Sequence, residues 1–475
     1  MKKLLLLIIL LISLTACVPS SNTETDTDSD SAENNDITLN GGDTDEVVSE
    51  NLHNFTFIIR TEIINDLTLD PVGSDTGRAD SMLARYKAVE DRYTCIINTG
   101  TVPANSSLTE LKSSSAATSK FADIVETTFA NVYNLHHSNL IISPEDVPNM
   151  DLTTEKWGLP SIFAATTFTD GKPYGFKPLY WGITPPTISN VMFYNQNLLK
   201  TFDLPDPGEL YETNLWSWHN FNEIALALTQ KIADDESIHA FSEPNDKYPA
   251  FLSAAITSNG GKYISKDYKN DWKFSLKEQN SVDAIEWVRN MVSNQKLAYR
   301  VSENHESNIL DILAFVNLKT VFLVTDSYAG MTMNEEYLLS TFDENFRWIS
   351  FPYGPKWEGK KSSIAIFSLN DQFAVMTTNF DTEKSFKIMD AIFEPLEDED
   401  INSWKTYLKR NYFFYDEDFS TYFNLLKDAQ SNDLIRLQSS NNKINSTLND
   451  LLTGISVPSQ AFELIEGIVL TGITE

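Results

Sequence analysis

The sequence predicts an α/β protein in which strands and helices alternate along the chain. Short runs of β-branched and aromatic residues, such as Phe55–Arg60, are typical of strands. Segments with apolar residues at the helical period follow them, as in Arg78–Tyr93. Such an order favours a mostly parallel sheet that helices cover on both faces. The chain of 475 residues is long enough for two ordinary domains.

The first 17 residues have the pattern of a bacterial lipoprotein signal peptide. Lys2–Lys3 is positively charged, and Leu4–Leu14 is an apolar stretch too short to span a bilayer comfortably. Leu14–Cys17 (LTAC) matches a lipobox, so we expect the mature chain to begin at an acylated Cys17. Each buried CH₂ contributes roughly 0.8 kcal/mol, so several acyl chains would anchor the protein stably. The alternative is an ordinary signal peptide with a chance cysteine.

Residues 18–53 form an acidic segment without Lys, Arg or aromatic residues. Such a segment cannot bury enough apolar surface to offset the entropy of ordering, so we expect a disordered tether. Repulsion between like charges extends it. Asp26, Asp28 and Asp30 resemble the start of a calcium loop, but Ser31 stands where that loop needs Gly. We therefore expect no metal site there.

The net charge and the number of cysteines restrict which partners and cross-links this protein can have. The formal net charge of −31 argues against nucleic acid and against an anionic membrane surface. Besides Cys17 the chain has only Cys95, so we expect neither an intramolecular disulfide nor a cysteine zinc site. Cys95 lies in an apolar run and is predicted to be buried. We expect a monomer that contacts the membrane only through its lipid anchor.

The first part of the folded chain contains three predicted strands, each followed by a helical pattern. The predicted strands are Phe55–Arg60, Thr94–Ile97 and Phe121–Val125. Ligands of parallel sheets bind at the carboxyl ends of strands. We therefore expect Arg60, Thr61 and Glu62, and the residues near Asp123, at the rim of a cleft.

Five motifs follow one another along the chain. They are Arg85–Tyr93 (RYKAVEDRY), Asp123–Ile124, Gly171–Gly175 (GKPYG), Met192–Leu199 with Trp216–Phe221, and Phe351–Pro355 (FPYGP). This series resembles the extracellular, sugar-type (family 1) solute-binding proteins of ABC importers. The resemblance implies a two-lobed periplasmic-binding-protein-like fold of type II, with a mostly parallel sheet in each lobe and a ligand cleft between them. It implies that residues 54–178 and 346–396 form lobe 1, and residues 179–345 and 397–475 form lobe 2.

The resemblance also implies where the ligand contacts lie. Tyr180 and Trp181 stand where the family's chain crosses between lobes, Asn259 precedes a Gly-Gly turn, and Tyr328 takes the place of a stacking aromatic. The C–H face of a sugar packs on aromatic rings, while carboxylates and amides take its hydroxyls. We expect Glu62 and Asn259 to bind hydroxyls and the three rings to stack. Core packing is the alternative for each aromatic residue.

Other positions have structural interpretations. Trp216 and Trp218 precede a helical pattern and are predicted to anchor its start, with His219 solvated. Leu318 stands where the family pattern FxxGKxAM has Gly. Thr471–Gly472 is predicted to be a turn, after which relatives usually continue into one more helix.

We therefore expect a receptor on the outer face of the cell membrane, on the extracellular or periplasmic side. It would capture a small solute, a sugar or oligosaccharide by the resemblance, and deliver it to the permease subunits of an ABC importer. No nucleophile elbow, H-E-x-x-H, phosphate loop or G-x-G-x-x-G is present, so we expect no catalytic residue, cofactor or metal. The adjacent pair His136–His137 is predicted to be exposed rather than metal-binding.

Two alternatives remain open. One is a surface-anchored glycoside hydrolase, because a carboxylate pair in a cleft would suffice for that chemistry. The other is a surface interaction lipoprotein that has kept the fold and lost its ligand.

Overall fold

The computed structural model describes the folded part of the chain in ten segments. They are residues 51–62, 76–180, 185–231, 238–244, 250–269, 271–301, 310–331, 346–357, 364–396 and 399–474. The predicted signal peptide, Cys17, nearly all of the tether and Trp181 lie outside the described residues. Within these segments no helix combines the length and the apolar character needed to cross a membrane.

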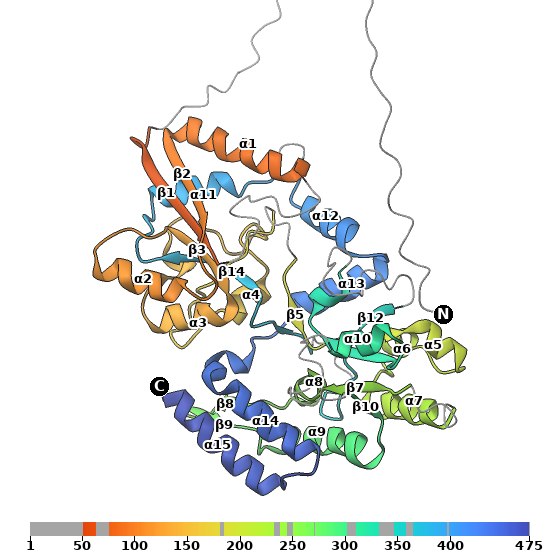
Figure 1. The fold of residues 1–475 in the computed structure, drawn as a ribbon. Coiled ribbons are helices and arrows are strands. Elements are labelled where there is room, and N and C mark those ends of the chain that lie inside the picture. Colours follow the sequence, from red (N-terminus) through yellow and green to blue (C-terminus); the bar gives the residue numbers. More distant parts are fainter. Residues whose placement is uncertain are drawn as a thin grey trace, which may run out of the picture. The chain divides into compact units, whose positions relative to one another are not determined.

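The first sheet contains five described strands in the order β2-β1-β3-β14-β4 (Figure 1). Strands β1 (Phe55–Thr61), β2 (Cys95–Thr101) and β3 (Ile124–Thr128) are parallel, which confirms the three predicted strand–helix units. Strand β14 (Gln372–Thr377) pairs antiparallel with β3 and with β4 (Ile141–Ile142). A late segment of the chain thus returns to complete this sheet.

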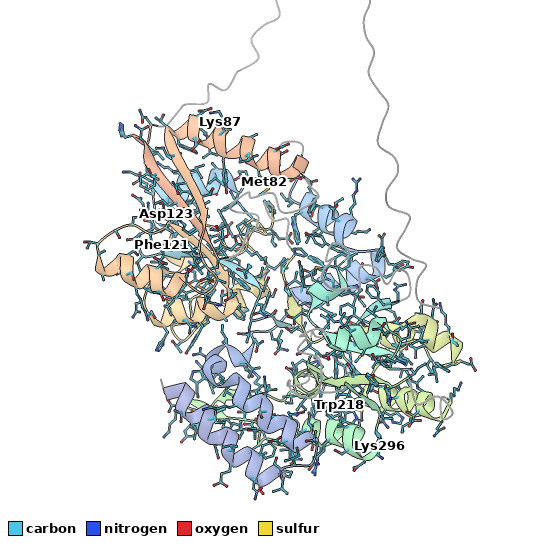
Figure 2. The ribbon with its side chains drawn as sticks, viewed as in Figure 1. Met82, Lys87, Phe121, Asp123, Trp218 and Lys296 are labelled. Atoms are coloured by element: carbon cyan, nitrogen blue, oxygen red, sulfur yellow. The ribbon has the colours of Figure 1, made fainter. Side chains whose placement is uncertain are left out.

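Helices with one apolar stripe lie next to the strands of the first sheet. They are α1 (Thr76–Tyr93), α2 (Ser107–Ala116), α3 (Phe129–His137) and α11 (Lys384–Ile392). Met82, Tyr86 and Val89 are buried at the helical spacing of α1. Lys87, on the same helix, has a side chain that is 77% exposed (Figure 2). The amphipathic pattern therefore determines which face of α1 packs on the core.

Asp123 corrects one expectation about the sheet edge. It precedes the first residue of β3 and so lies at the amino end of that strand, not at the carboxyl end. Its buried carboxylate accepts hydrogen bonds from the backbone N–H of Ile58 and from Ser385 Oγ, and lies 2.7 Å from Lys120 Nζ. Burial raises its pKa, although these partners oppose the shift. Asp123 ties strand, helix and loop together, and it is not at the predicted rim.

The second sheet has the strand order β11-β6-β12 and is antiparallel among its described strands. The central strand β6 (Val191–Asn195) is buried at all five positions and pairs with β11 (Phe322–Thr325) and β12 (Phe346–Ser350). The described strands of this part of the chain are therefore mixed in direction, and these three are antiparallel where the prediction had a mostly parallel sheet. The periodicity of a buried strand does not reveal the direction of its neighbours. A parallel pair joins β7 (Phe241–Pro244) to β10 (Ala298–Val301), and the residues before β7 bridge in parallel to those before β11 through His239 and Thr320.

The helices near the second sheet follow the predicted pattern. They are α5 (Gln196–Thr201), α6 (Pro207–Glu212), α7 (Trp218–Lys231), α8 (Ala250–Ser258), α9 (Gln279–Arg289) and α10 (Leu310–Val316). Trp216 Nε1 donates to the carbonyl of Ser350 at 2.8 Å. Trp218, labelled in Figure 2, stacks on Trp287 with ring centroids 4.2 Å apart. Both indoles are buried, so their predicted structural role is confirmed.

Helical segments complete the chain. They are α12 (Ser403–Tyr412), α13 (Asp416–Lys427), η6 (Asp433–Ser440), α14 (Asn441–Leu452) and α15 (Pro458–Thr474). The turn predicted at Thr471–Gly472 is wrong, because both residues lie within α15. Ile465 and Val469 are fully buried one turn apart, so core packing continues the helix where local sequence suggests a turn. Helix α15 also contacts β9 (Trp272–Phe274), which pairs with β8 (Ile264–Lys266).

A pair of short strands and one buried carboxyl group connect the two sheets. Strand β5 (Ile188–Ser189) pairs with β13 (Ile366–Phe367). The carboxylate of Asp326 accepts hydrogen bonds from Ser189 Oγ and Ser368 Oγ. One apolar cluster contains residues from both sheets, including Phe373 of β14 and Trp348 of β12. The connection between the sheets is thus a packed interior.

Candidate functional site

The carboxyl end of β1 carries a buried polar network around Glu62. One oxygen of its carboxylate accepts a hydrogen bond from the backbone N–H of Ser107, at the start of α2, at 2.9 Å. The other accepts from Thr127 Oγ1 and, at 3.0 Å, from Asn131 Nδ2. A carboxylate at a helix N-terminus is also favoured by the helix dipole. Glu62 is 5% exposed and ties two strands to two helices at the edge where we expected a ligand contact.

Two more of the predicted contacts are turned inward. Tyr180 is buried within the cluster that joins the sheets, and this burial raises its pKa. Asn259 is fully buried after α8. Its Nδ2 donates to the carbonyl of Asn280 at 2.9 Å, and its Oδ1 accepts from the backbone N–H of Lys356 at 3.1 Å. Asn259 therefore fastens a turn to two other segments of the chain.

Tyr328 differs from the other described candidates. It lies in the 3₁₀ turn η3 (Ser327–Gly330), which follows β11, and the residue as a whole is 38% exposed. Trp181, the fifth predicted contact, lies outside the described residues. The structure does not bring Glu62 and Asn259 together, since each belongs to its own hydrogen-bond network.

A cavity of about 290 Å³ lies beside the Gly-Gly turn that follows Asn259. Its lining combines the end of α8, the turn, one indole, strand β13 and the segment that enters η6. The lining residues are Ser253, Ile256, Thr257, Gly260, Gly261, Lys262, Tyr263, Trp357, Ile366, Gln430, Ser431, Asn432 and Asp433. Glu62, Tyr180, Asn259 and Tyr328 are not among them.

Glycine is required at one wall of this cavity. Gly260 has a φ of +72°, in the left-handed region that residues with a Cβ adopt only at a cost. A Cβ at this position would lie 3.5 Å from the ring of Trp357. The turn thus brings backbone close to an indole. The Gly-Gly pattern predicted the turn itself, which follows the end of α8 at Ser258.

Asp433 supplies a carboxyl group to the same cavity. It is the first residue of η6 and is partly buried. Burial raises the pKa of Asp433 to about 6, although the charges of Lys262 and Arg436 and a hydrogen bond from the backbone N–H of Tyr263 act in the opposite direction. At neutral pH this group is mostly an acceptor-only carboxylate close to a lysine.

Asn432 and Ser431 are positioned by the protein itself. Asn432 Oδ1 accepts from the backbone N–H of Leu434 at 3.0 Å, and Ser431 Oγ donates to the carbonyl of Ala165 at 3.1 Å. Asn432 Nδ2 also donates to the carbonyl of Phe367 at 3.3 Å, so its amide is fully engaged within the protein. A cavity with one indole, a carboxylate and a lysine fits a small polyhydroxylated molecule, because rings cover C–H faces and polar groups take hydroxyls.

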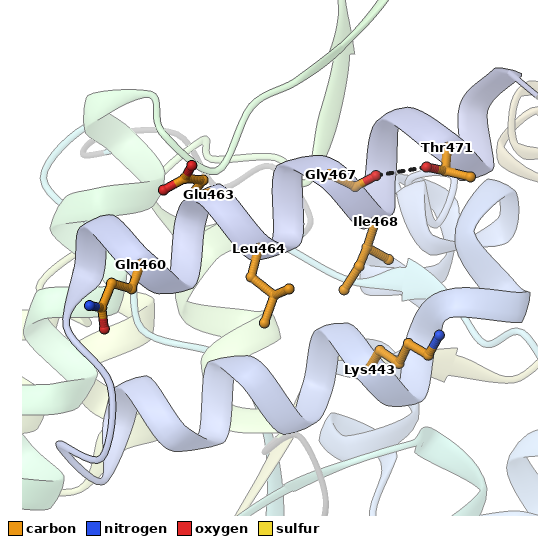
Figure 3. Close-up of a pocket in the computed structure, with 7 residues that line it drawn as sticks. All are labelled: Lys443, Gln460, Glu463, Leu464, Gly467, Ile468 and Thr471. Carbon is orange, nitrogen blue, oxygen red and sulfur yellow. Dashed lines mark hydrogen bonds between the residues drawn. The ribbon is translucent and has the colours of Figure 1, made fainter.

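A second, wider hollow of about 610 Å³ lies between α14 and α15 (Figure 3). It is lined by Lys443, Gln460, Glu463, Leu464, Gly467, Ile468 and Thr471. Leu464 is 57% exposed at its edge. This groove has no carboxylate–aromatic combination like that beside Gly260, so it does not fit the same ligand.

Metal binding finds no support in the described segments. No group of three or more His, Cys, Asp or Glu side chains in them is placed to hold an ion. The prediction that both histidines of the pair are exposed is wrong for His136, which is partly buried. It packs against Phe168 and Tyr174, with ring centroids 4.9 and 4.2 Å away, and burial lowers its pKa. His137 is exposed, as predicted, and stacks on Tyr133.

The sequence analysis missed the residues that line the cavity. Trp357 lies two residues after Pro355 of the FPYGP motif, which entered the sequence analysis only as one motif of the resemblance. Asp433 lies in residues 397–475, where the sequence analysis named no ligand contact. The run Ser431-Asn432-Asp433 consists of residues that favour helix starts and turns, and it was the available signal.

The fold is similar to that of several solved receptors. The sugar-binding protein MalE from Xanthomonas citri matches with a TM-score of 0.62 at 14% identity, over 88% of this chain and 97% of that one. The cyclic α-maltosyl-1,6-maltose binding protein from Arthrobacter globiformis gives 0.62 at 12% identity, over 88% and 99%. UgpB from Mycobacterium tuberculosis, in complex with glycerophosphocholine, gives 0.56 at 14%, over 89% and 98%.

No model of a known protein family matches the sequence, and no curated protein does. The structural matches extend over nearly the full length of the solved chains. The predicted two-lobed periplasmic-binding-protein-like α/β fold is therefore confirmed.

Proposed function

We propose that this protein is the substrate-binding lipoprotein of an ABC importer and that it captures a sugar or oligosaccharide. The observation that carries the proposal is the cavity beside Gly260, where Trp357 and Asp433 combine a ring and a carboxylate. The fold supports it, because solved chains of this fold include a sugar-binding protein and a maltosyl-maltose binding protein. The same fold also holds glycerophosphocholine in UgpB, so non-sugar polyols belong in the test.

The proposed lobes follow the predicted boundaries with one change. We assign β12 (Phe346–Ser350) to the second lobe, because it pairs with β6 along its whole length. A ligand held between two lobes favours their closed arrangement by its differential contacts with the two states. A permease would then distinguish the loaded from the empty receptor.

The predicted contacts divide into two proposed roles. Tyr328, the one described candidate that is not buried, keeps the proposed stacking role. Asn259 supports the Gly-Gly turn of the cavity from behind, through its hydrogen bonds to residues 280 and 356. We propose that Glu62 and Tyr180 hold their own elements in place and do not touch the ligand, because both are packed inside the protein. We retain Trp181 as a proposed stacking residue on the basis of its place in the crossing.

We also propose acylation at Cys17 and a position on the outer face of the cell membrane. The support is the sequence pattern of residues 1–17 and the acidic segment 18–53, which would hold the receptor off the surface. We propose that the receptor acts as a monomer.

Thermal unfolding of the full chain tests the ligand. The panel contains glucose, maltose, maltotriose, maltotetraose and glycerophosphocholine, each over a range of concentrations. A ligand that binds only the folded state raises Tm as its concentration increases. We expect at least one saccharide to do so, and we expect Asp433→Asn and Trp357→Ala to reduce the shift. Asp428→Asn, an exposed position just after α13, is the matched control and should keep it.

Two outcomes contradict the proposal. If no saccharide raises Tm, the sugar receptor is wrong and the surface interaction protein becomes the better interpretation. If chromatography shows that the saccharides are cleaved, and one carboxylate substitution abolishes cleavage, the protein is a glycoside hydrolase.

A further inference from the structure

The guanidinium of Arg436 lies between two aromatic rings from distant parts of the chain. Its Cζ is 4.3 Å from the ring centroid of Trp272 in β9 and 4.8 Å from that of Tyr133 in α3. Its Nη1 also donates a hydrogen bond to Tyr133 Oη at 3.0 Å. Helix α3 accompanies the first sheet, whereas β9 contacts α15 in the proposed second lobe. Arg436 therefore touches both proposed lobes.

The two rings are themselves held in place. Tyr133 packs edge-on against Phe168 with centroids 5.4 Å apart and stacks on His137. Trp272 opposes Lys266 across the β8–β9 ladder, and Lys266 Nζ lies 5.3 Å from its ring centroid. Each ring is thus fixed to its own element, so Arg436 cannot keep both contacts if the elements move apart.

Arg436 is connected to the cavity through η6. It follows Asp433 by one helical turn, and Asp433 lines the cavity beside Gly260. Upstream, Gln430 bridges to Ile366 of β13 in the connection between the sheets. The segment from Gln430 to Arg436 therefore runs from this connection, along the cavity, to the contact with α3.

The surroundings of the guanidinium favour a strong contact. Arg436 is partly buried, and this burial lowers its pKa. A cation over an aromatic face is more strongly attracted when it is desolvated, and a planar guanidinium can stack on rings while it donates hydrogen bonds.

We propose that Arg436 is a positioning residue which clamps α3 to β9 and thereby sets the angle between the two lobes before any ligand binds. The proposal rests on the two-lobed receptor proposed above but not on the identity of its ligand. A clamp of this kind raises the fraction of empty receptor that is ready to bind, and the apparent Kd is the intrinsic Kd divided by that fraction.

Electron–electron distance measurements on the full chain without ligand test the clamp. Spin labels are attached at Lys87→Cys on α1 and Lys296→Cys, two positions that Figure 2 labels. Lys87 and Lys296 are both exposed. Cys17 is replaced by serine in every variant so that it takes no label. The native Cys95 is buried and its pKa is raised to about 11, so it reacts poorly with the label.

With Arg436 present we expect one narrow distance distribution. Arg436→Ala should broaden it and shift its mean, because both ring contacts are lost. Arg436→Lys should give an intermediate distribution, since lysine keeps the charge but not the planar stacking. Arg410→Ala, an exposed arginine of α12, removes the same charge elsewhere and should leave the distribution unchanged.

If Arg436→Ala gives the same distribution as the wild type, the clamp is wrong. Should that variant fail to fold, Arg436→Lys and Tyr133→Phe decide, and an unchanged distribution in both overturns the proposal. The result is independent of the saccharide panel. A Tm rise with sugar and an unchanged distance would reject the clamp alone, while a changed distance without any sugar effect would reject the sugar ligand alone.

Discussion

The ammonium of Lys177 and the carboxylate of Asp371 lie 2.8 Å apart in the interior of the protein, with side chains 11% and 2% exposed. Lys177 Nζ also donates to the carbonyl of Gln372 at 2.9 Å. Burial raises the pKa of Asp371, and the neighbouring lysine opposes that shift. Removing one partner of a buried pair leaves the other charge without compensation in a medium that solvates it poorly.

We therefore expect Lys177→Met to lower the free energy of unfolding by about 3–5 kcal/mol, measured by urea denaturation. The matched control is Lys273→Met, which breaks the exposed pair with Glu278, whose side chains are 46% and 50% exposed. Its effect should stay within about 1 kcal/mol, because exposed pairs contribute little. Equal effects of the two substitutions would show that the buried pair is not a structural requirement.

Gly330 and Gly467 should respond in opposite directions to substitution by alanine. A Cβ at Gly330 would lie 2.3 Å from the nearest ring atom of Phe193 and 2.7 Å from that of Trp348, and both rings are buried. Gly330→Ala should destabilise by about 1–3 kcal/mol through overpacking. Gly467 lies inside α15 with nothing within 4 Å of its Cβ position, so Gly467→Ala should stabilise by about 0.5–1 kcal/mol. Urea denaturation of both variants checks this, and a loss of stability in Gly467→Ala would contradict it.

Leu318 has a left-handed backbone with a φ of +58° and is 43% exposed. This is the position where the family pattern has glycine. The left-handed conformation costs a residue with a Cβ roughly 1–2 kcal/mol, while glycine loses about 0.5–1 kcal/mol more backbone entropy on folding. Leu318→Gly should therefore stabilise by about 0.5 kcal/mol, seen as a small rise in the urea midpoint.

Leu464→Gly is the control for this prediction. Leu464 is also exposed but lies inside α15, where glycine should cost about 1 kcal/mol. If both leucine-to-glycine changes destabilise, the backbone conformation at Leu318 does not carry the cost that its φ implies.

The Asp433 carboxyl group should make stability depend on pH in a defined direction. Burial raises its folded-state pKa to about 6, above the unfolded value of about 3.9. A raised pKa means that the folded state binds the proton more tightly than the unfolded state does. The resulting contribution to the free energy of unfolding is complete below the unfolded pKa and is lost as pH rises through about 6. Asp433→Asn, which mimics the protonated acid, should match the wild type near pH 4 and exceed its Tm near pH 8.

Thermal unfolding at several pH values between 4 and 8 measures this difference. Asp428→Asn serves as the control, because Asp428 is exposed and its difference from the wild type should not change in the same way. A constant difference between Asp433→Asn and the wild type would contradict the role of burial.

Local sequence patterns predicted most elements of the first sheet correctly. The strand–helix order from β1 to α3 and the buried stripe of α1 follow from apolar periodicity, which is a property of consecutive residues. The structural role of Trp218 was also predictable, because an indole at the start of an amphipathic helix can pack against the same core as the apolar face of that helix. Leu318 was recognised as a departure, although only the structure shows its left-handed backbone.

The candidate site was much less predictable. Glu62 follows a strand end, as a ligand contact would. Its carboxylate, however, accepts hydrogen bonds from the N-terminus of α2 and from the side-chain amide of Asn131. The side-chain amide of Asn259 is likewise hydrogen-bonded to the backbone of residues 280 and 356. A local pattern specifies where a polar group lies on its own element and says nothing about which distant groups will satisfy it.

By itself, the sequence determined the alternation of strands and helices, the acidic, cysteine-poor character of the chain and the resemblance to two-lobed receptors. Only the tertiary structure decided that β14 enters the first sheet beside β3, that β11 and β12 pair antiparallel with β6, and that residues near 260, 357 and 433 enclose one cavity. The reason is physical. Periodicity is set by neighbouring residues, whereas strand partners and cavity walls are set by packing between segments that are far apart in the chain.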